Sequence, residues 1–548
     1  MKSINSWLFA IIAALVCGSW VRAQETHQHH HQHEASEKLG QVNFTISCGP
    51  AAQKQFNRAA ALLHSFWYEE AEKAFAEVTK ADSGCAMGYW GVAMSNYHPI
   101  WAPPDPAELK RGVAAIEQAK TAKTKTDRER DYIGALAAFY QDSDKVNHRA
   151  RAEAYAQAME QVYRRYPKDR EAAIFYSLAL LGTAVSTDKS YARQKQAAEI
   201  LNQVLPQEPE HPGVAHYLIH SFDYPQLAQL ALPAARSYAK IAPSSPHALH
   251  MPSHIFTRLG LWQESIQSNL ASAEAARRHV AATHPGSTSF DRLHAQDYLV
   301  YAYLQGQQDY KAEAIEEELS HVDRVDVESF AAAYALAAVP ARFWLEKRHW
   351  EAAAELTVRP QTFPWKRYPY AEAITHFARA MGAARSGRPA AAEGDLENLT
   401  AIQAKLAEAK DPYWAGQVEI QRREAAAWLA RAEGDNEKAL TLMRSAVELE
   451  EATEKHPVTP GPIIPAREQL GDLLLELDRP EQALREYEAS LANSPNRYNG
   501  IYGAAHAAEL LGDMESAKNY YTKLLALCGR AEGGRPELAK ARSFLAQQ

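Results

Sequence analysis

Apolar positions along most of this chain recur every three or four residues, which is the spacing of one face of an α-helix. In residues 245–259 the apolar stripe consists of Leu249, Phe256 and Leu259, and the small residue Ser253 stands where a second helix would approach. Runs that alternate apolar and polar residues are scarce, and stretches rich in alanine, a strong helix former, are frequent. The pattern predicts an all-α protein.

The helical pattern itself repeats along the chain. The segment HPGVAHYLIHSF (residues 211–222) aligns with SPHALHMPSHIF (residues 245–256) at a uniform offset of 34 residues, so that a proline, two histidines and a phenylalanine coincide. Nearer the N-terminus, His64 aligns with His98 by the same offset. A fixed period of this length indicates a repeat protein, in which each unit packs on its neighbours.

The C-terminal part contains the clearest single repeat. In AREQLGDLLLELDRPEQALREYEASLANSP (residues 466–495), Leu470 and Gly471 fall in a first helix, and the small residue Ser490 falls in a second. Small residues at such positions, Gly471 among them, are expected to let the paired helices approach closely. This segment and the 34-residue period resemble the tetratricopeptide repeat (TPR), although Ser490 stands where that repeat usually has alanine. The resemblance implies a right-handed superhelix of antiparallel helix hairpins over roughly residues 50–545, with the first helices lining the concave surface.

The N-terminal end has the composition of an exported protein. Residues 1–23 combine Lys2, the apolar stretch WLFAIIAALVCGSW and a small-residue site ending at Ala23, which is typical of a signal peptide. The apolar stretch is too short to favour a permanent membrane span, so we expect a periplasmic or secreted protein with no transmembrane segment after cleavage. Residues 24–47 are expected to form a disordered tail, whose HQHHHQH sequence can chelate divalent metals.

The remainder divides by composition into two arrays. Residues 48–327 are rich in histidine, tryptophan and tyrosine, and residues 328–548 are more charged and more regular. Within the second array, HPVTPGPIIP (residues 456–465) is expected to be an extended connector. Export to an oxidising compartment permits a disulfide between Cys48 and Cys85.

Charge and motifs exclude several functions. The formal charge of −8, from 59 basic and 67 acidic residues, gives no basic excess and argues against a nucleic-acid partner. The chain lacks a Walker loop, the G-x-S-x-G motif and the zincin H-E-x-x-H motif. The sequence therefore assigns no catalytic residue and leaves open whether the protein is an enzyme.

Histidines are concentrated in three consecutive repeats. They recur at spacings of three and four, which places them on one side of each inner helix and away from its packing stripe. Two histidines four residues apart can bind one ion, and imidazole-rich sites suit zinc, copper or iron. The predicted ligands of a divalent transition metal are His216, His220, His247, His250, His254, His294 and Asp297. The segments around these histidines also resemble exported bacterial TPR proteins, a resemblance that implies the fold but no reaction.

Pro252 lies between two of these histidines, and two interpretations are open. A proline inside one helix would kink it, free the carbonyl of Ala248 and change the direction of His250 relative to His254. Alternatively, a helix that starts at Met251 would hold the proline in its first turn without strain.

Aromatic residues extend the expected groove towards the N-terminus. The residues predicted to line a ligand groove are Trp90, Met94, His98, Trp101, Tyr176, Tyr301 and Arg342, with core packing as the alternative for the aromatic ones.

The leading hypothesis is an exported TPR solenoid that binds a transition metal, or a metal-dependent ligand, in its concave groove. One alternative is a metal-free adaptor of the cell envelope that binds a peptide or protein. The other is a metal-dependent hydrolase or oxidase built on a TPR scaffold. The expected partner in the concave groove is a peptide, a protein or a small-molecule ligand.

Overall fold

The computed structural model describes residues 37–123, 126–529 and 534–547, and residues 38–548 form one compact unit. The predicted signal peptide and residues 24–36 of the predicted tail lie outside the described residues. In the described part the regular elements are helices, and none of them is both long and apolar enough to cross a membrane. The prediction of an all-α protein is confirmed.

The N-terminal helices are α1 (Pro50–His64), α2 (Tyr68–Ala81), α3 (Ala86–Ser95), α4 (Pro106–Thr121), α5 (Asp127–Tyr140), α6 (His148–Arg165), α7 (Arg170–Gly182), α8 (Ala192–Val204), α9 (Pro212–Phe222), the 3₁₀ helix η1 (Ala228–Ala231), α10 (Leu232–Ile241), α11 (Pro246–His250), α12 (Pro252–Arg258), α13 (Trp262–Thr283), α14 (Phe290–Gln305) and α15 (Asp309–Ser320). The C-terminal helices are α16 (Phe330–Glu346), α17 (Trp350–Ala354), the 3₁₀ helix η2 (Trp365–Arg367), α18 (Pro369–Arg385), α19 (Pro389–Glu408), α20 (Pro412–Ala432), α21 (Asn436–Ala452), α22 (Ala466–Glu476), α23 (Pro480–Asn493), α24 (Tyr498–Leu510), α25 (Met514–Leu527) and α26 (Pro536–Ala546).

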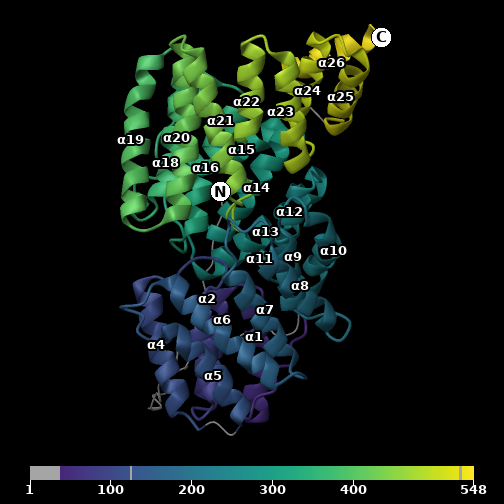
Figure 1. The fold of residues 1–548 in the computed structure, drawn as a ribbon. Helices are drawn as coiled ribbons and strands as arrows, with labels where there is room; N and C mark the ends of the chain where they lie inside the picture. The colour runs from purple at the N-terminus through teal and green to yellow at the C-terminus, as the bar shows by residue number, and fades with distance from the viewer. Residues whose placement is uncertain (1–36, 124–125, 530–533, 548) are drawn as a thin grey trace, which may run out of the picture. The chain divides into compact units, whose positions relative to one another are not determined.

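Consecutive helices pack as hairpins, as α18 with α19, α20 with α21, and α24 with α25 (Figure 1). The short turns use residues with positive φ, for example Gly434 at 89° and Gly512 at 75°. Gly471 on α22 gives the partner helix room, because a Cβ atom there would lie only 2.8 Å from the ring of Tyr487. Helix pairing at a glycine is what the sequence predicts for this repeat.

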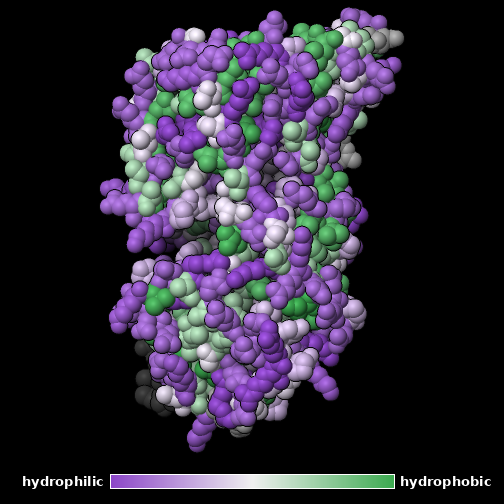
Figure 2. Space-filling model, viewed as in Figure 1, coloured by the Kyte–Doolittle hydropathy of each residue, from purple (hydrophilic) through white to green (hydrophobic). Residues whose placement is uncertain are grey.

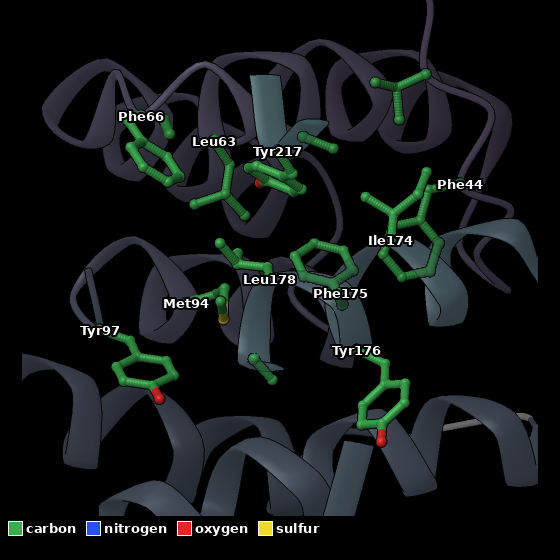
Figure 3. Close-up of a cluster of buried hydrophobic side chains, with 14 of the residues drawn as sticks. Phe44, Leu63, Phe66, Met94, Tyr97, Ile174, Phe175, Tyr176, Leu178 and Tyr217 are labelled. Carbon is green, nitrogen blue, oxygen red and sulfur yellow. The ribbon is translucent and has the colours of Figure 1, made fainter. Parts of the chain in front are cut away.

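A large aromatic cluster forms the core of the first helices (Figure 3). Phe44 is fully buried and contacts the rings of Phe56, Trp90, Tyr132 and Phe175. Burial of aromatic rings therefore supplies much of the packing in this half.

On the face shown in Figure 2 the surface is largely hydrophilic, with hydrophobic residues in scattered patches.

The segment 38–47 is part of the fold, although the sequence-based boundary assigned it to a disordered tail. Its backbone is extended, and its apolar side chains are buried alternately with exposed polar ones: Leu39, Val42, Phe44 and Ile46. The amide of Gln41 donates to the carbonyl oxygen of Glu210 at 2.9 Å. Apolar and polar residues alternate here as they do in a half-buried extended strand. The polar residues between the buried apolar ones made the segment resemble the polar tail that precedes it. A disulfide joins Cys48, just after this segment, to Cys85 with a Cα–Cα distance of 5.5 Å.

A second extended segment, residues 453–465, lies against the inner helices; we call it the inner segment. It contains the predicted connector. Arg342 of α16 donates to the carbonyl oxygens of Pro462 and Ile463 at 2.7 and 3.1 Å, and Tyr298 of α14 donates to that of Val458 at 3.1 Å. Side chains of helices that are far away in the sequence thus donate hydrogen bonds to the backbone carbonyls of the inner segment.

Candidate metal centre

Six buried histidines meet at the junction of α9, α11, α12 and α14. Their side chains are between 0 and 7% exposed. They form two groups of three whose ring nitrogens lie within 4.8 Å of one another. We call His216, His220 and His247 the first triad, and His250, His254 and His294 the second triad.

Pro252 separates α11 from α12. Helix α11 ends at His250 and α12 begins at Pro252, while Met251 between them keeps right-handed helical dihedral angles (φ −52°, ψ −34°). The proline therefore occupies the first turn of a new helix, where its missing N–H has no cost. This arrangement corresponds to the unstrained interpretation of the sequence.

The first triad centres on His216. Its Nε2 atom lies 3.1 Å from Nε2 of His220 and 3.2 Å from Nε2 of His247. Its Nδ1 atom lies 2.7 Å from the carbonyl oxygen of His64. A carbonyl oxygen can only accept, so the His216 proton is on Nδ1, and Nε2 presents a lone pair to the other two rings.

The second triad has hydrogen-bond acceptors behind two of its rings. His250 Nδ1 lies 2.6 Å from the amide oxygen of Asn269, and His254 Nδ1 lies 3.0 Å from Oδ2 of Asp223. Both acceptors place the histidine protons on Nδ1. The two Nε2 atoms, 3.0 Å apart, therefore face each other as lone pairs and cannot form a hydrogen bond.

His294 completes the second triad. Its ring centroid is 4.2 Å from that of His250, and its buried Nε2 atom has no hydrogen-bond partner among the described residues. A buried nitrogen without a partner carries a desolvation cost of about 1–3 kcal/mol, which a bound cation would remove.

The spacing of the nitrogens fits a shared ion. Nitrogens bound at about 2.0–2.1 Å to a tetrahedral ion lie roughly 3.3 Å from each other. The observed separations of 3.0 to 3.2 Å are close to that edge length. Small movements of the rings would therefore admit an ion at either triad.

Burial keeps these imidazoles neutral, which is the form that binds metal. Loss of solvation lowers the pKa of His216 to about 3, even though the hydrogen bond to the His64 carbonyl opposes the shift. Burial, followed by repulsion from neighbouring imidazolium groups, lowers the pKa of His220, His247 and His250 well below its ordinary value.

Asp223 supports the second triad from behind. Its carboxylate accepts from His254, from Arg258 Nε at 2.9 Å and from Lys455 Nζ at 2.7 Å. Burial opposes ionisation of Asp223, but the two cations hold its pKa well below the usual value. A carboxylate bound to the far nitrogen of a metal-binding histidine fixes the ring and raises its basicity.

A third group, His64, Glu171 and His211, has metal-site composition but a different hydrogen-bond pattern. Glu171 accepts from His64 Nε2 at 3.1 Å and from His211 Nε2 at 3.0 Å. The remaining nitrogens accept from Tyr217 at 2.9 Å and from the Gly213 amide at 3.1 Å. Every ring nitrogen has a complementary partner, so this group is a satisfied hydrogen-bond network.

One helix hairpin of the chain resembles a known protein family. A family model described as "Tetratricopeptide repeat" matches residues 499–529, which cover α24 and α25. The matched segment is one helix hairpin of the kind that recurs along the unit. The chain therefore contains a tetratricopeptide repeat. A search of curated proteins finds no match.

Two solved structures are among those similar to the chain. The human IFIT1 dimer with m7Gppp-AAAA is 12% identical, with a TM-score of 0.36 over 81% of this chain and 90% of that chain. Yeast Tom70 is 11% identical, with a TM-score of 0.34 over 91% of this chain and 96% of that chain.

Within the TPR array, the structure gathers the six predicted histidines but not Asp297. That carboxylate belongs to neither triad and lies 3.7 Å from Arg342 Nε. Burial raises its pKa to about 6 against the opposing effect of Arg342. Tyr301, on the same helix face, accepts from Arg497 at 2.8 Å.

The predicted groove residues have several different environments. Trp101 is in contact with both triads, because its ring lies 5.4 Å from His247 and 5.5 Å from His294. Arg342 holds the inner segment. The others lie in or beside the aromatic core of the first helices: Trp90, Met94, His98 and Tyr176.

Several residues that complete the site were not predicted from the sequence. Phe66 packs 4.3 Å from His216, ring centre to ring centre, and shields the first triad. Asp223 and Asn269 orient the second triad from a helix end and from α13. Only Asp223 had a local indication, because it follows His220 by three residues; the others are brought in by packing between repeats.

A cavity of about 390 Å³ lies beside the side chains that bind Asp223, the carboxylate behind the second triad. The residues that line it include Arg258, Lys455, Tyr370, Trp414 and Glu424. Because Arg258 and Lys455 both bind Asp223, a molecule in this cavity would be separated from His254 by one carboxylate.

Proposed function

We propose that this TPR protein binds transition-metal ions through the first and second triads. The observation that carries the proposal is the placement of the histidine protons. In the first triad, His216 presents the lone pair of Nε2 to the rings of His220 and His247 at 3.1 and 3.2 Å. In the second triad, acceptors behind His250 and His254 leave their two Nε2 lone pairs facing each other at 3.0 Å inside the protein. A metal ion is the partner that converts this repulsive arrangement into a stabilising one.

The donor set narrows the choice of ion. Six imidazoles without a carboxylate among them favour zinc, copper or iron over magnesium, calcium or manganese. We further propose, from the signal-peptide composition of residues 1–23, that the protein is periplasmic or secreted. The histidine-rich stretch His27–His33 would then collect metal outside the cytoplasm.

The two alternatives differ in what they require. A metal-free adaptor would need a groove open to a peptide, but the inner segment already occupies the inner surface with its own backbone. A hydrolase or oxidase would need a substrate beside the ions. The cavity behind Asp223 is the nearest candidate position for a small-molecule ligand.

The proposal is tested by elemental analysis of untagged protein that lacks residues 24–36. We expect bound transition metal in this protein and its loss in the double variant His220→Ala/His254→Ala, which removes one ligand from each triad. The control is His376→Ala, because His376 bonds to Asp395 on α19, outside the triads. Full metal content in the double variant would refute the proposal.

A further inference from the structure

The triads are close enough to share one centre. We propose that they are the two halves of a dinuclear copper site whose resting state is copper(I). This inference rests on the proposed function, since it requires that the triads bind metal.

Proximity is the first argument. The rings of His220 and His254 have centroids 6.2 Å apart, and those of His247 and His250 are 6.1 Å apart. Each ion lies about 2 Å from its ring nitrogens, so ions in the two triads would be separated by roughly the 6 Å between these rings. Helix α11 supplies His247 to one triad and His250 to the other, which ties the halves together.

The repeat explains why the halves are alike. His216 and His220 become His250 and His254 on adding 34 residues, so each triad contains one pair spaced by four. A third histidine from the following inner helix completes each set. Duplication of one TPR hairpin thus produces two adjacent sites with three neutral nitrogens each.

Charge is the second argument, and it favours a monovalent ion. The carboxylate that bonds to a triad histidine is Asp223, and Arg258 and Lys455 already neutralise it. Asp297 lies beside Arg342. Among the residues that the structure describes, the groups around the triads therefore contribute no net negative charge to balance two ions.

Because negative charge is lacking around the triads, Coulomb's law decides which charge the two ions can carry. Two divalent ions repel each other four times as strongly as two monovalent ions at the same separation, and a buried site screens the repulsion poorly. Phe66 and Trp101 pack against the rings and exclude water from them. Of the metals that imidazole binds well, copper is the one with a stable monovalent state.

The test uses untagged protein without residues 24–36, loaded anaerobically with either copper(I) or Zn²⁺. We expect two copper ions per chain, an X-ray absorption edge of copper(I), and retention of copper against an equal concentration of Zn²⁺. After oxidation with ferricyanide, the two copper(II) ions should give a spin-coupled electron paramagnetic resonance spectrum.

Single-triad variants separate the halves. His247→Asn and His294→Asn should each retain one copper and give an uncoupled copper(II) spectrum after oxidation, while His376→Ala keeps two coupled ions. Circular dichroism verifies that each variant is folded. Two uncoupled ions in the parent protein, or preference for zinc, would overturn this inference and leave metal binding intact. Absence of any bound metal in the parent protein would overturn both proposals.

Discussion

At the scale of single residues, His64 shows how position within a repeat decides chemistry. Its side chain bonds to Glu171 and Tyr217, while its backbone carbonyl accepts from His216 of the first triad. The same residue therefore belongs to a satisfied network and orients a candidate metal ligand. Composition alone does not distinguish these two roles, whereas the assignment of protons to nitrogens does.

Because the protons of His64 and His211 are satisfied by Glu171, we expect the variant His211→Ala to affect stability but not metal content. The variant removes one of the two histidine donors to the buried carboxylate of Glu171, so we expect a loss of about 1–3 kcal/mol in the free energy of unfolding. Urea denaturation and elemental analysis of the same preparation provide the measurements. A fall in metal content in folded protein would show that His64, Glu171 and His211 also bind metal.

The sequence predicted the histidine pairs because spacings of three and four place side chains on one helix face. It could not predict Asn269 or Phe66, which reach the triads only through packing between repeats. It included Asp297 because the spacing also fits, but packing on α16 directs that carboxylate to Arg342. Local periodicity thus locates candidate ligands, and tertiary contacts select among them.

At the scale of elements, each hairpin depends on small residues where its helices touch. Tyr487 of α23 lies between Gly471 of α22 and Gly503 of α24. A Cβ atom at Gly503 would come within 2.3 Å of the Tyr487 ring. The sequence predicted this packing at Gly471 because the repeat pattern fixes where helices approach.

Gly471→Trp should therefore unfold the C-terminal hairpins before the rest of the array. The indole would have to displace Tyr487, and the repeats beyond it pack mainly on their neighbours. Limited proteolysis is expected to cleave within residues 466–547 and to leave an N-terminal fragment that contains both triads. Gly394→Trp is the matched control, since a Cβ atom there meets no other atom of the described residues within 4 Å. Equal protease resistance of both variants would contradict the assigned packing.

At the scale of the whole described unit, two extended segments join helices that are distant in the sequence. The inner segment binds α14 and α16, and residues 38–47 lie against the start of α9. Gly40, with φ of 86°, lets the backbone approach so closely that a Cβ atom would lie 2.8 Å from the carbonyl oxygen of Glu210. Repeat periodicity describes neighbouring hairpins only, and so it could not predict these long-range contacts.

The N-terminal segment should consequently affect both stability and the metal centre. Phe44→Ala removes a fully buried ring from the aromatic core, which is expected to lower the free energy of unfolding by about 3–5 kcal/mol. Because the same segment holds the start of α9, which carries His216 and His220, we also expect faster loss of metal to a chelator. Asn43→Ala, at an exposed neighbouring position, should change stability by less than about 0.5 kcal/mol and leave metal release unchanged. Unfolding by urea and the rate of metal transfer to a chromogenic chelator measure the two effects. If Phe44→Ala lowers stability while metal release keeps its parental rate, the segment supports the core without supporting α9.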